Sequence, residues 1–312
     1  MSVSDEEFIE FFKMHGATGT AKKLQLTIRS VFERRRRLEK RLNIKLIPPS
    51  EEAKKYKSII NDQEDFKLKD GIILVGSDAH YWPSHISTAH RAFVKFCENL
   101  KPSAVVLNGD VLDGASISRH AKIAFEYTPT VVEEIETCQE RLSEIEAAIP
   151  SQCKKYWTMG NHDLRLESRL ANLVPEYAKV HGFQIKDHFP YWNTCMSLWV
   201  NNDLIIKHRF KGGTHATHNN TLWAGKSICT GHLHSLRVTA FNDYNPNTRY
   251  GIDCGTLCDV YGQQFSYNEN SPVNWRSGFI VLTFKNKELL WPEIVHVMDD
   301  GKAQFRGEIF NV

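Results

Sequence analysis

The chain has 312 residues, of which 41% are hydrophobic and 24% charged, and its formal net charge is +2. These values are ordinary for a water-soluble globular protein, and the length suffices for one large core with a small appendage. No apolar run approaches the roughly 20 residues that span a bilayer, which excludes a membrane-spanning protein. The first residues do not form a signal peptide and the seven cysteines are scattered, so we expect a reduced, cytoplasmic protein of a bacterium or of a phage-infected cell.

Residues 1–46 differ in character from the rest of the chain. Apolar residues at helical spacing predict a first helix over Asp5 to Met14, which ends at Gly16. A short second helix near 19–24, a turn at 25–27 and a third helix over 28–42 follow. Two short helices and a turn before a basic helix resemble a helix-turn-helix module, whose recognition helix enters the DNA major groove. The sequence therefore predicts a small, all-α, helix-turn-helix-like domain.

The positive charge of the chain is concentrated in this amino-terminal segment. Between His15 and Leu46 there are ten Lys/Arg and only two Asp/Glu. Neutralising several phosphates releases counterions and gives affinity without sequence readout, so we expect DNA as a partner. An alternative is a basic amphipathic helix that packs on the rest of the protein or binds a partner protein, with the arginine run as a solvated face. The candidate DNA-binding residues are Arg29, Arg34, Arg35, Arg36 and Arg37.

A polar stretch separates this module from a larger α/β domain. Pro48-Pro49 marks the boundary, so residues 47–70 are predicted as a linker and 71–312 as the second domain. Apolar runs at 71–77, 104–108 and 155–159 are typical of buried strands, and helices are predicted at about 86–100, 130–148 and 164–172. A hairpin is expected to turn at 201–203 between strands at 196–200 and 204–207. The remaining predicted strands lie at 227–230, 236–242, 249–254 and 278–284.

A polar motif follows each of five strand-like runs. Two of these motifs follow their strands with a glycine directly before the polar residue: Gly109 precedes Asp110, and Gly160 precedes Asn161. Glycine permits the tight backbone that brings a ligand close to a metal. Carboxylates, amide oxygens and imidazoles bind divalent cations, and two cations about 3.5–4 Å apart need a bridging ligand such as a carboxylate. The motif residues are Asp78, His80, Asp110, Asn161, His162, Asp163, His208, His232 and His234.

Each motif has a simpler explanation when it is taken alone. An Asp-x-His or Gly-Asp pair usually makes a turn or a cap, and a single His208 is more often a packed core histidine. The joint pattern favours a site because all five motifs stand at the carboxyl end of a strand, where open α/β sheets place their ligands.

In this order the motifs resemble those of the calcineurin-like metallophosphoesterase superfamily: Asp-x-His, Gly-Asp, Gly-Asn-His-Asp/Glu, His and Gly-His-x-His. The resemblance covers about residues 70 to 260 and implies a four-layer α/β/β/α sandwich. It also implies that one metal ion is held by Asp78, His80, Asp110 and His234, and the other by Asp110, Asn161, His208 and His232. Asp110 then bridges the two ions.

The resemblance assigns catalytic roles to the Gly-Asn-His-Asp motif. His162 is expected to donate a proton to the leaving oxygen, while a hydroxide formed from metal-bound water attacks phosphorus. Asp163 is expected to orient the His162 ring; its alternative is a helix N-cap, because 164–170 is predicted to be helical. The expected cofactors are two divalent ions, Mn²⁺ first, with iron or zinc also compatible with these ligands.

Other polar residues near the motifs are candidates for contacts with substrate phosphate. Arg119, His120 and His218 rank first among them, ahead of Asp113, Arg165, Arg209 and His215. Guanidinium suits bidentate phosphate binding, although a solvated surface position is the simpler explanation for each residue.

Three functions remain open at this point. The first is a nuclease-like phosphodiesterase in which the amino-terminal module holds DNA or RNA; sequences of this general kind resemble phage and prophage proteins. The second is a phosphomonoesterase or small-molecule diesterase whose basic arm serves assembly. The third is a DNA-binding regulator with a relic esterase fold, which a complete ligand set disfavours. A homodimer is compatible with a helix-turn-helix module, and no membrane partner is expected.

Overall fold

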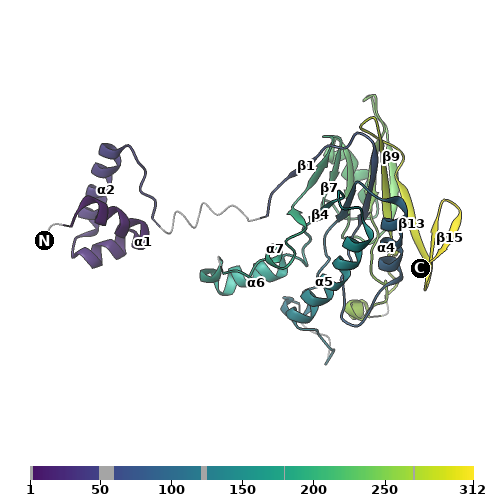
Figure 1. Cartoon of the computed structure of the whole chain (residues 1–312), viewed down its shortest axis with the longest axis horizontal. Coiled ribbons are helices and arrows are strands. Elements are labelled where there is room, and N and C mark those ends of the chain that lie inside the picture. The colour runs from purple at the N-terminus through teal and green to yellow at the C-terminus, as the bar shows by residue number, and fades with distance from the viewer. Residues whose placement is uncertain (1–2, 49–59, 121–124, 179, 270) are drawn as a thin grey trace. The chain divides into compact units, whose positions relative to one another are not determined.

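The computed structural model describes residues 3–48, 60–120, 125–178, 180–269 and 271–312. The chain forms two compact units, Met1–Ile59 and Ile60–Val312, which are coloured along the chain in Figure 1. Of the predicted linker, residues 49–59 lie outside the described part. Its carboxyl-terminal portion differs from the prediction, because Glu64–Phe66 is a strand (β1) that pairs with a strand of the second unit.

The first unit contains the helices that the sequence predicts. The helix α1 (Asp5–Leu24) begins at a Ser4 capping box and bends at Gly16, where φ is 66°, so it consists of two helical segments. After a turn, α2 (Ile28–Leu42) begins at the N-cap Thr27. The two helices bury their own core, made of Phe8, Phe12, Ala21, Val31, Leu38 and Leu46.

Three of the five arginines predicted to bind DNA pair with an acidic residue of the same unit, and two of these, Arg34 and Arg35, are only partly exposed. Arg34 donates from Nη2 to Asp5 Oδ1 at 2.7 Å and to the Val3 carbonyl at 2.7 Å. Arg35 pairs with Glu39 at 3.0 Å, and its side chain is only 17% exposed. The Arg34 guanidinium ties α2 to Val3 and Asp5, whereas the Arg35 ion pair lies within α2. DNA contact by these two residues stays a prediction. In contrast, Arg36 and Arg37 are exposed and have no ion pair among the described residues, and Arg29 is 89% exposed beside Glu33.

The second unit contains two sheets that pack face to face. One has nine strands, in the order β15-β14-β13-β11-β2-β3-β4-β5 with β12 beside β11; the other has the order β1-β6-β7-β8-β10-β9. The nine strands are β2 (Gly71–Gly76), β3 (Ala104–Leu107), β4 (Lys154–Thr158), β5 (Asn193–Cys195), β11 (Gly278–Lys285), β12 (Glu288–Leu289), β13 (Glu293–Asp299), β14 (Lys302–Phe305) and β15 (Glu308–Asn311). The second sheet adds β6 (Leu198–Val200), β7 (Leu204–Ile206), β8 (Ser227–Thr230), β9 (Arg237–Phe241) and β10 (Arg249–Asp253) to β1.

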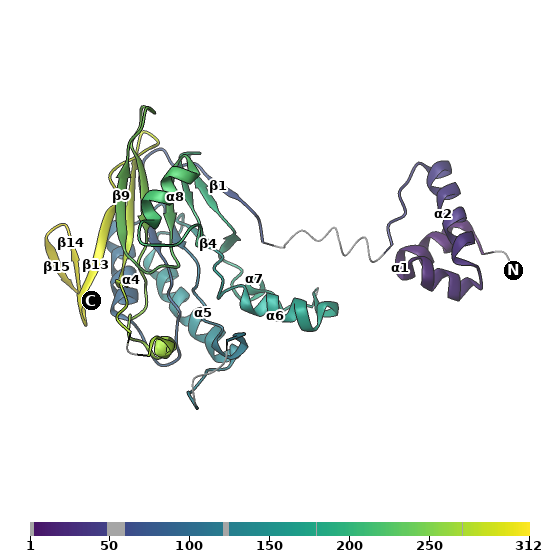
Figure 2. The same cartoon turned by 180° about the vertical axis from the view of Figure 1, so that it is seen from behind.

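Helices cover the outer faces of both sheets. The helices α4 (Thr88–Leu100) and α5 (Val131–Ala148) share one apolar core with alternate residues of β2 and β3. The remaining residues of those strands pack against β6, β7, β8 and β10 in a second core between the sheets. The helix α8 (Ala216–Ala224) covers the other sheet at β8, β9 and β10; α4 and α5 are seen in Figure 1, and α8 is labelled in the reverse view of Figure 2. The predicted α/β/β/α sandwich is confirmed.

Parallel pairing brings the predicted motifs to common sheet edges. The strands β2, β3 and β4 run parallel to one another, and β7 runs parallel to β8, so the carboxyl ends of each set lie side by side. The strongly apolar elements lie close to their predicted positions. Elements that the sequence did not predict include α8, β1, β5 and the short strands after residue 287, as well as α7 (Ile185–His188) and the 3-10 turns at 115–117, 175–177 and 263–268. Next to the site, α6 spans Arg165–Leu173. None of the described helices is long and apolar enough to span a membrane.

Candidate functional site

The backbone at the strand ends turns in a way that L-amino acids rarely adopt. Positive φ angles occur at Asp78 (52°), His80 (39°), Asp110 (51°), His232 (71°) and His234 (54°). A non-glycine residue with positive φ is strained, and such strain persists where the surrounding structure imposes it, commonly at functional sites. Five of the seven predicted metal ligands are therefore held in an unfavourable conformation that aims their side chains at one place.

Two motif glycines are required by close approach. A Cβ on Gly160 would lie 2.1 Å from Asp110 Oδ1, and one on Gly109 would lie 2.4 Å from the His208 ring. These distances are far inside van der Waals contact, so only glycine lets the loops after β3, β4 and β7 converge. The space around a third motif glycine, Gly231, is equally small, since a Cβ there would lie 2.0 Å from Ser77 Oγ.

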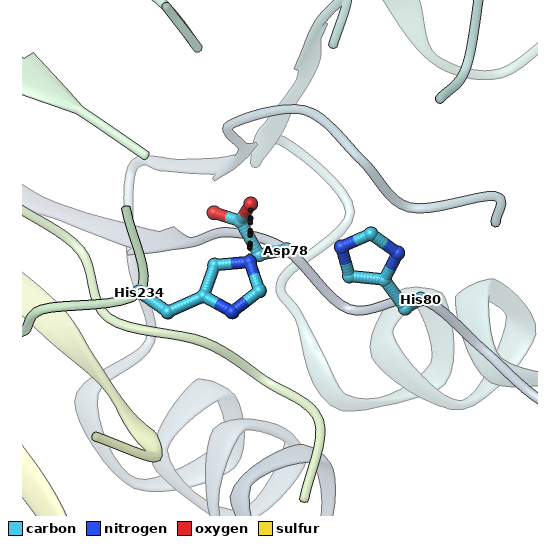
Figure 3. A group of neighbouring side chains, drawn as sticks. All are labelled: Asp78, His80 and His234. Atoms are coloured by element: carbon cyan, nitrogen blue, oxygen red, sulfur yellow. Dashed lines mark hydrogen bonds and ion pairs between the residues drawn. The ribbon is translucent and has the colours of Figure 1, made fainter. Parts of the chain in front are cut away.

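One group of candidate ligands lies at the end of β2. Asp78, His80 and His234 place ligand atoms within 4.8 Å of one another. In Figure 3 the dashed line joins the Asp78 carboxylate to the His234 ring, whose Nε2 lies 3.0 Å from Oδ1, and His80 lies beside this pair. The backbone N–H of His232 also donates to Asp78, at 2.9 Å. His232 and His234, which lie 154 and 156 positions after Asp78 in the sequence, thus both contact the Asp78 carboxylate.

A second group lies beside the first. Asp110, His208 and His232 also lie within ligand distance of one another, with His208 Nε2 3.0 Å from Asp110 Oδ2. The Asn108 carbonyl accepts from His208 Nδ1 at 2.7 Å, which directs Nε2 toward the carboxylate. Asp110 Oδ2 also lies 4.0 Å from His80 Nε2. Asp110 therefore stands between the two groups, where a bridging ligand is needed.

The electrostatics of this pair of groups favour bound cations. Burial alone lowers the pKa of a histidine, but the carboxylates of Asp110 and Asp78 outweigh it and raise the pKa of His208 to about 9. Burial lowers the pKa of His80 and keeps that ring neutral, as a metal ligand must be. Asp78 and Asp110 are both buried, and two buried carboxylates at one place favour a cation beside them.

The donor set fits two divalent ions. His80 Nε2 and Asn161 Oδ1 are buried atoms without a hydrogen-bond partner in the described part of the chain. An unsatisfied buried polar atom costs about 1–3 kcal/mol, so these two atoms, of which His80 Nε2 lies 4.0 Å from Asp110 Oδ2, fit a site for a cation. Imidazole nitrogen, carboxylate oxygen and one amide oxygen are ligands for borderline divalent metals.

The comparisons with known proteins agree with this geometry. A model of the family described as calcineurin-like phosphoesterase matches residues 72–264. The chain belongs to this family. It is a family of metal-dependent phosphoesterases that use two metal ions, and the candidate ligand groups lie within the matched residues.

Solved structures with a similar chain trace are distant in sequence. A vacuolar protein sorting 29 from Cryptosporidium parvum has 14% identity and a TM-score of 0.43, covering 78% of this chain and 100% of its own. The phosphoesterase Yfce from E. coli has 11% identity and a TM-score of 0.34, covering 71% and 97%. A metallophosphoesterase from Sphaerobacter thermophilus has 12% identity and a TM-score of 0.37, covering 69% and 84%. No curated protein sequence matches this chain.

His162 lies at the edge of the metal-ligand groups of this phosphoesterase, held by Asp113. Its Nδ1 donates to the Asp113 carbonyl at 2.9 Å and lies 3.1 Å from Asp113 Oδ1. The same carboxylate oxygen lies 2.8 Å from His80 Nδ1, so Asp113 orients both rings. Arg165 Nη2 lies 3.1 Å from His162 Nε2 and donates to it while the ring is neutral. Burial lowers the pKa of His162, but Asp113 and Asp110 outweigh burial and raise it overall.

Asp163 does not have the predicted role. Its carboxylate accepts N–H groups from the loops after β3 and β4 instead of contacting His162: from Asp110, Val111, Leu112 and Gly160, and from Trp157 Nε1, at 2.8–3.0 Å. It also does not cap α6, whose N-cap is Leu164. Asp163 therefore fastens the Gly109-Asp110 loop to the Gly160-Asn161 loop, and the ring-orienting carboxylate is Asp113. The sequence signal that points to Asp113 is its place three residues after Asp110.

The candidate substrate contacts separate into near and distant positions. His120 lines a cavity of 410 Å³ together with His162, Asp113 and Arg165. Arg119 is exposed and is not among the residues that line this cavity. His218 is on α8, where its ring packs against Phe241 at 5.2 Å between ring centroids. The described contacts do not join His218 to either group of candidate ligands.

Proposed function

We propose that this metallophosphoesterase is a phosphodiesterase that cleaves nucleic acid, most readily DNA, with the amino-terminal unit holding the polymer. The observation that carries the proposal is the union in one chain of a dimetal phosphoesterase unit and a small helical unit with exposed arginines. A small soluble phosphoester gains nothing from a second, basic unit, whereas a polyanion gains affinity from each phosphate that is neutralised.

Asp78, His80, Asp110 and His234 are the proposed holders of one cation, and Asp110, Asn161, His208 and His232 of the other. Bound divalent ions supply Lewis acidity, which neutralises phosphate charge and makes water a better nucleophile. Mn²⁺ is our proposal for the metal, since the oxygen and imidazole ligands suit it; the same ligands are compatible with iron or zinc.

His162 is the proposed general acid. Its Nδ1 is fixed by Asp113, so its Nε2 is the atom that donates to the leaving oxygen. Arg165 is placed to exchange its contact with Nε2 for a phosphate oxygen, because a guanidinium binds an anion more strongly than a neutral ring nitrogen. This exchange frees Nε2 to take a proton from solvent, which it then donates to the leaving oxygen.

Arg29, Arg36 and Arg37 are the proposed DNA contacts of the amino-terminal unit. Their side chains are exposed, whereas those of Arg34 and Arg35 are only partly exposed and pair with Asp5 and Glu39; Arg41 of α2 is also exposed but pairs with Asp5. Two such units on one DNA, as in a homodimer, are compatible with this mode of binding.

The test is product release from end-labelled single- and double-stranded DNA with Mn²⁺. The variants are His162→Ala and the double variant Arg36→Ala/Arg37→Ala. The control is the double variant Lys154→Ala/Lys302→Ala, in which two exposed lysines of the second unit are replaced. We expect His162→Ala to abolish cleavage. The arginine variant should bind DNA more weakly. The slope of its log binding constant against log salt concentration should be smaller in magnitude by about 0.9 per lost phosphate contact, and the lysine control should match the wild type.

The competing functions give different results in the same experiment. A metal-loaded protein that hydrolyses an aryl phosphate ester but no DNA or RNA is a phosphomonoesterase or small-molecule diesterase. DNA binding without turnover in any metal indicates the regulator with a relic esterase fold.

A further inference from the structure

A cavity adjoins His162, whose side chain is part of its lining. It has a volume of 410 Å³, and its lining includes the polar residues Asp113, His162 and Arg165 and the aromatic residues Trp82, Tyr127 and Tyr267. Ligand pockets for small molecules begin at about 300 Å³, so the cavity has room for one nucleoside and not for a stretch of duplex.

The aromatic side chains of this cavity are unusually accessible. Tyr127 is 61% exposed and Tyr267 is 54% exposed, whereas Trp82 is 7% exposed and meets the Tyr127 ring edge-on, with 6.5 Å between ring centroids. Trp82 therefore forms a buried wall, and more than half of each tyrosine is left uncovered by the described part of the chain. Exposed aromatic rings beside a phosphoesterase centre are suited to stack on planar groups.

Polar groups complete the lining. Gln263, Gln264 and Ser266, from the 3-10 turn at 263–268, line the cavity, and so does Ser118 from the facing loop. Amide and hydroxyl groups both donate and accept, so they are able to pair with the edge of any base without selecting one strictly. The lining combines stacking surfaces with unselective hydrogen-bonding groups.

We propose that this cavity binds the base of the nucleoside that leaves when the phosphodiester is cut. The inference rests on the proposed function, and it names the substrate class: a phosphodiester whose leaving alcohol carries a nucleobase. The P–O bond to the leaving oxygen breaks and its electron pair passes to that oxygen, which takes the proton from His162 Nε2. The oxygen of water bonds to phosphorus, and the proton that the water loses passes to solvent. The leaving nucleoside must therefore lie on the His162 side, which is where the cavity is.

The first experiment measures inhibition of aryl phosphodiester hydrolysis by free nucleosides, with thymidine and adenosine as probes. Both should inhibit the Mn²⁺-loaded wild type. Because base stacking on an aromatic ring changes affinity by about 5- to 150-fold per base, Tyr127→Ala and Tyr267→Ala should weaken inhibition within that range. Tyr261→Ala is the matched control, since Tyr261 is 85% exposed but lines a different cavity. Thermal unfolding of each variant checks that it folds.

The second experiment uses dinucleoside monophosphates in which one of the two bases is absent. Removing the base of the leaving nucleoside should raise KM, and removing the other base should change it much less. In the Tyr127→Ala variant, removing the leaving base should raise KM by a smaller factor than in the wild type. Equal KM values for both base-free substrates, or nucleoside inhibition that is absent or unchanged in the tyrosine variants, overturn the cavity assignment.

The two proposals fail in different ways. If nucleosides inhibit through Tyr127 and Tyr267 but no dinucleotide or DNA is cut, the nucleic-acid function is rejected and the pocket belongs to a smaller nucleotide diester. If DNA is cut but base removal has no effect, the nuclease function stands and the cavity assignment is rejected.

Discussion

Replacing Asp113 by asparagine tests how His162 is held. The side chain keeps its size but loses its charge, and its Oδ1 faces both His80 Nδ1 at 2.8 Å and His162 Nδ1 at 3.1 Å. A hydrogen bond to a charged acceptor contributes about 1.5–3 kcal/mol, against about 0.5–1.5 kcal/mol for a neutral one. The bond to His162 therefore loses about 1–2 kcal/mol, which corresponds to about 5- to 30-fold in kcat when proton donation limits the rate.

The assay is a series of methyl aryl phosphodiesters whose phenols differ in acidity, measured at saturating Mn²⁺. Saturation removes any effect that reaches the metal through His80. A nitrophenol departs as a stable anion and needs little proton donation, so Asp113→Asn should be nearly normal with it. Unsubstituted phenol is a poor leaving group and should show the full loss. Asp259→Asn, at an exposed Asp259–His85 pair, is the control.

The result that refutes the reasoning is a loss of equal size across the whole series. Such a loss means that Asp113 acts through metal loading or through the fold, and the His162 assignment as general acid then has no support from this pair. Wild-type behaviour with every phenol refutes the orienting role of Asp113 as well.

Three further predictions concern the metal centre, the pH dependence of folding and the amino-terminal unit. Gly160→Ala places a Cβ 2.1 Å from Asp110 Oδ1, which costs about 1–3 kcal/mol and should weaken Mn²⁺ binding at least about 5-fold in titration calorimetry. The control is Gly212→Ala, whose Cβ would meet only Leu233 at 3.9 Å, and this variant should bind Mn²⁺ as the wild type does. Burial and the charge of Asp113 raise the pKa of Glu134 from 4.5 to about 7. The free energy of unfolding of the metal-free protein should therefore fall by up to about 3 kcal/mol as pH rises from about 4.5 to 7. Urea titrations should show this fall in the wild type and not in Glu134→Gln. Arg34→Ala should lower the stability of the amino-terminal unit by about 1 kcal/mol through lost bonds to Asp5 and Val3, whereas Arg36→Ala should leave its thermal unfolding unchanged.

The grouping of the candidate metal ligands was predictable because it depends on local patterns. Buried strands are continuous apolar runs, and a polar motif that ends each run must lie at the carboxyl edge of a parallel sheet. The positions of Asp78, Asp110 and Asn161 follow from that rule once β2, β3 and β4 are recognised. The glycines before Asp110 and Asn161 supported the prediction because glycine lets two loops approach closely, and the structure shows such a close approach of Gly160 to Asp110.

Elements with weak apolar patterns were not predicted. The helix α8 is rich in threonine, asparagine and histidine, so its sequence resembles a loop, and its packing on β8, β9 and β10 is what orders it. The strands after residue 287 are short, and β14 alternates exposed and buried residues over only four positions. Such segments become strands because neighbouring strands supply hydrogen-bond partners, which a single segment does not reveal.

The role of Asp163 was mistaken because adjacency in sequence does not imply contact. The turn after β4 sends neighbouring side chains in different directions: the His162 ring reaches Asp113, 49 residues earlier, while the Asp163 carboxylate turns inward to the N–H groups of two loops. The arginine run shows a related effect. The sequence counts charge, but folding pairs Arg34 with Asp5, 29 residues away. A basic helix therefore offers DNA most readily the cations that its own tertiary structure does not use, and of the five predicted contacts Arg36 and Arg37 have no ion pair among the described residues.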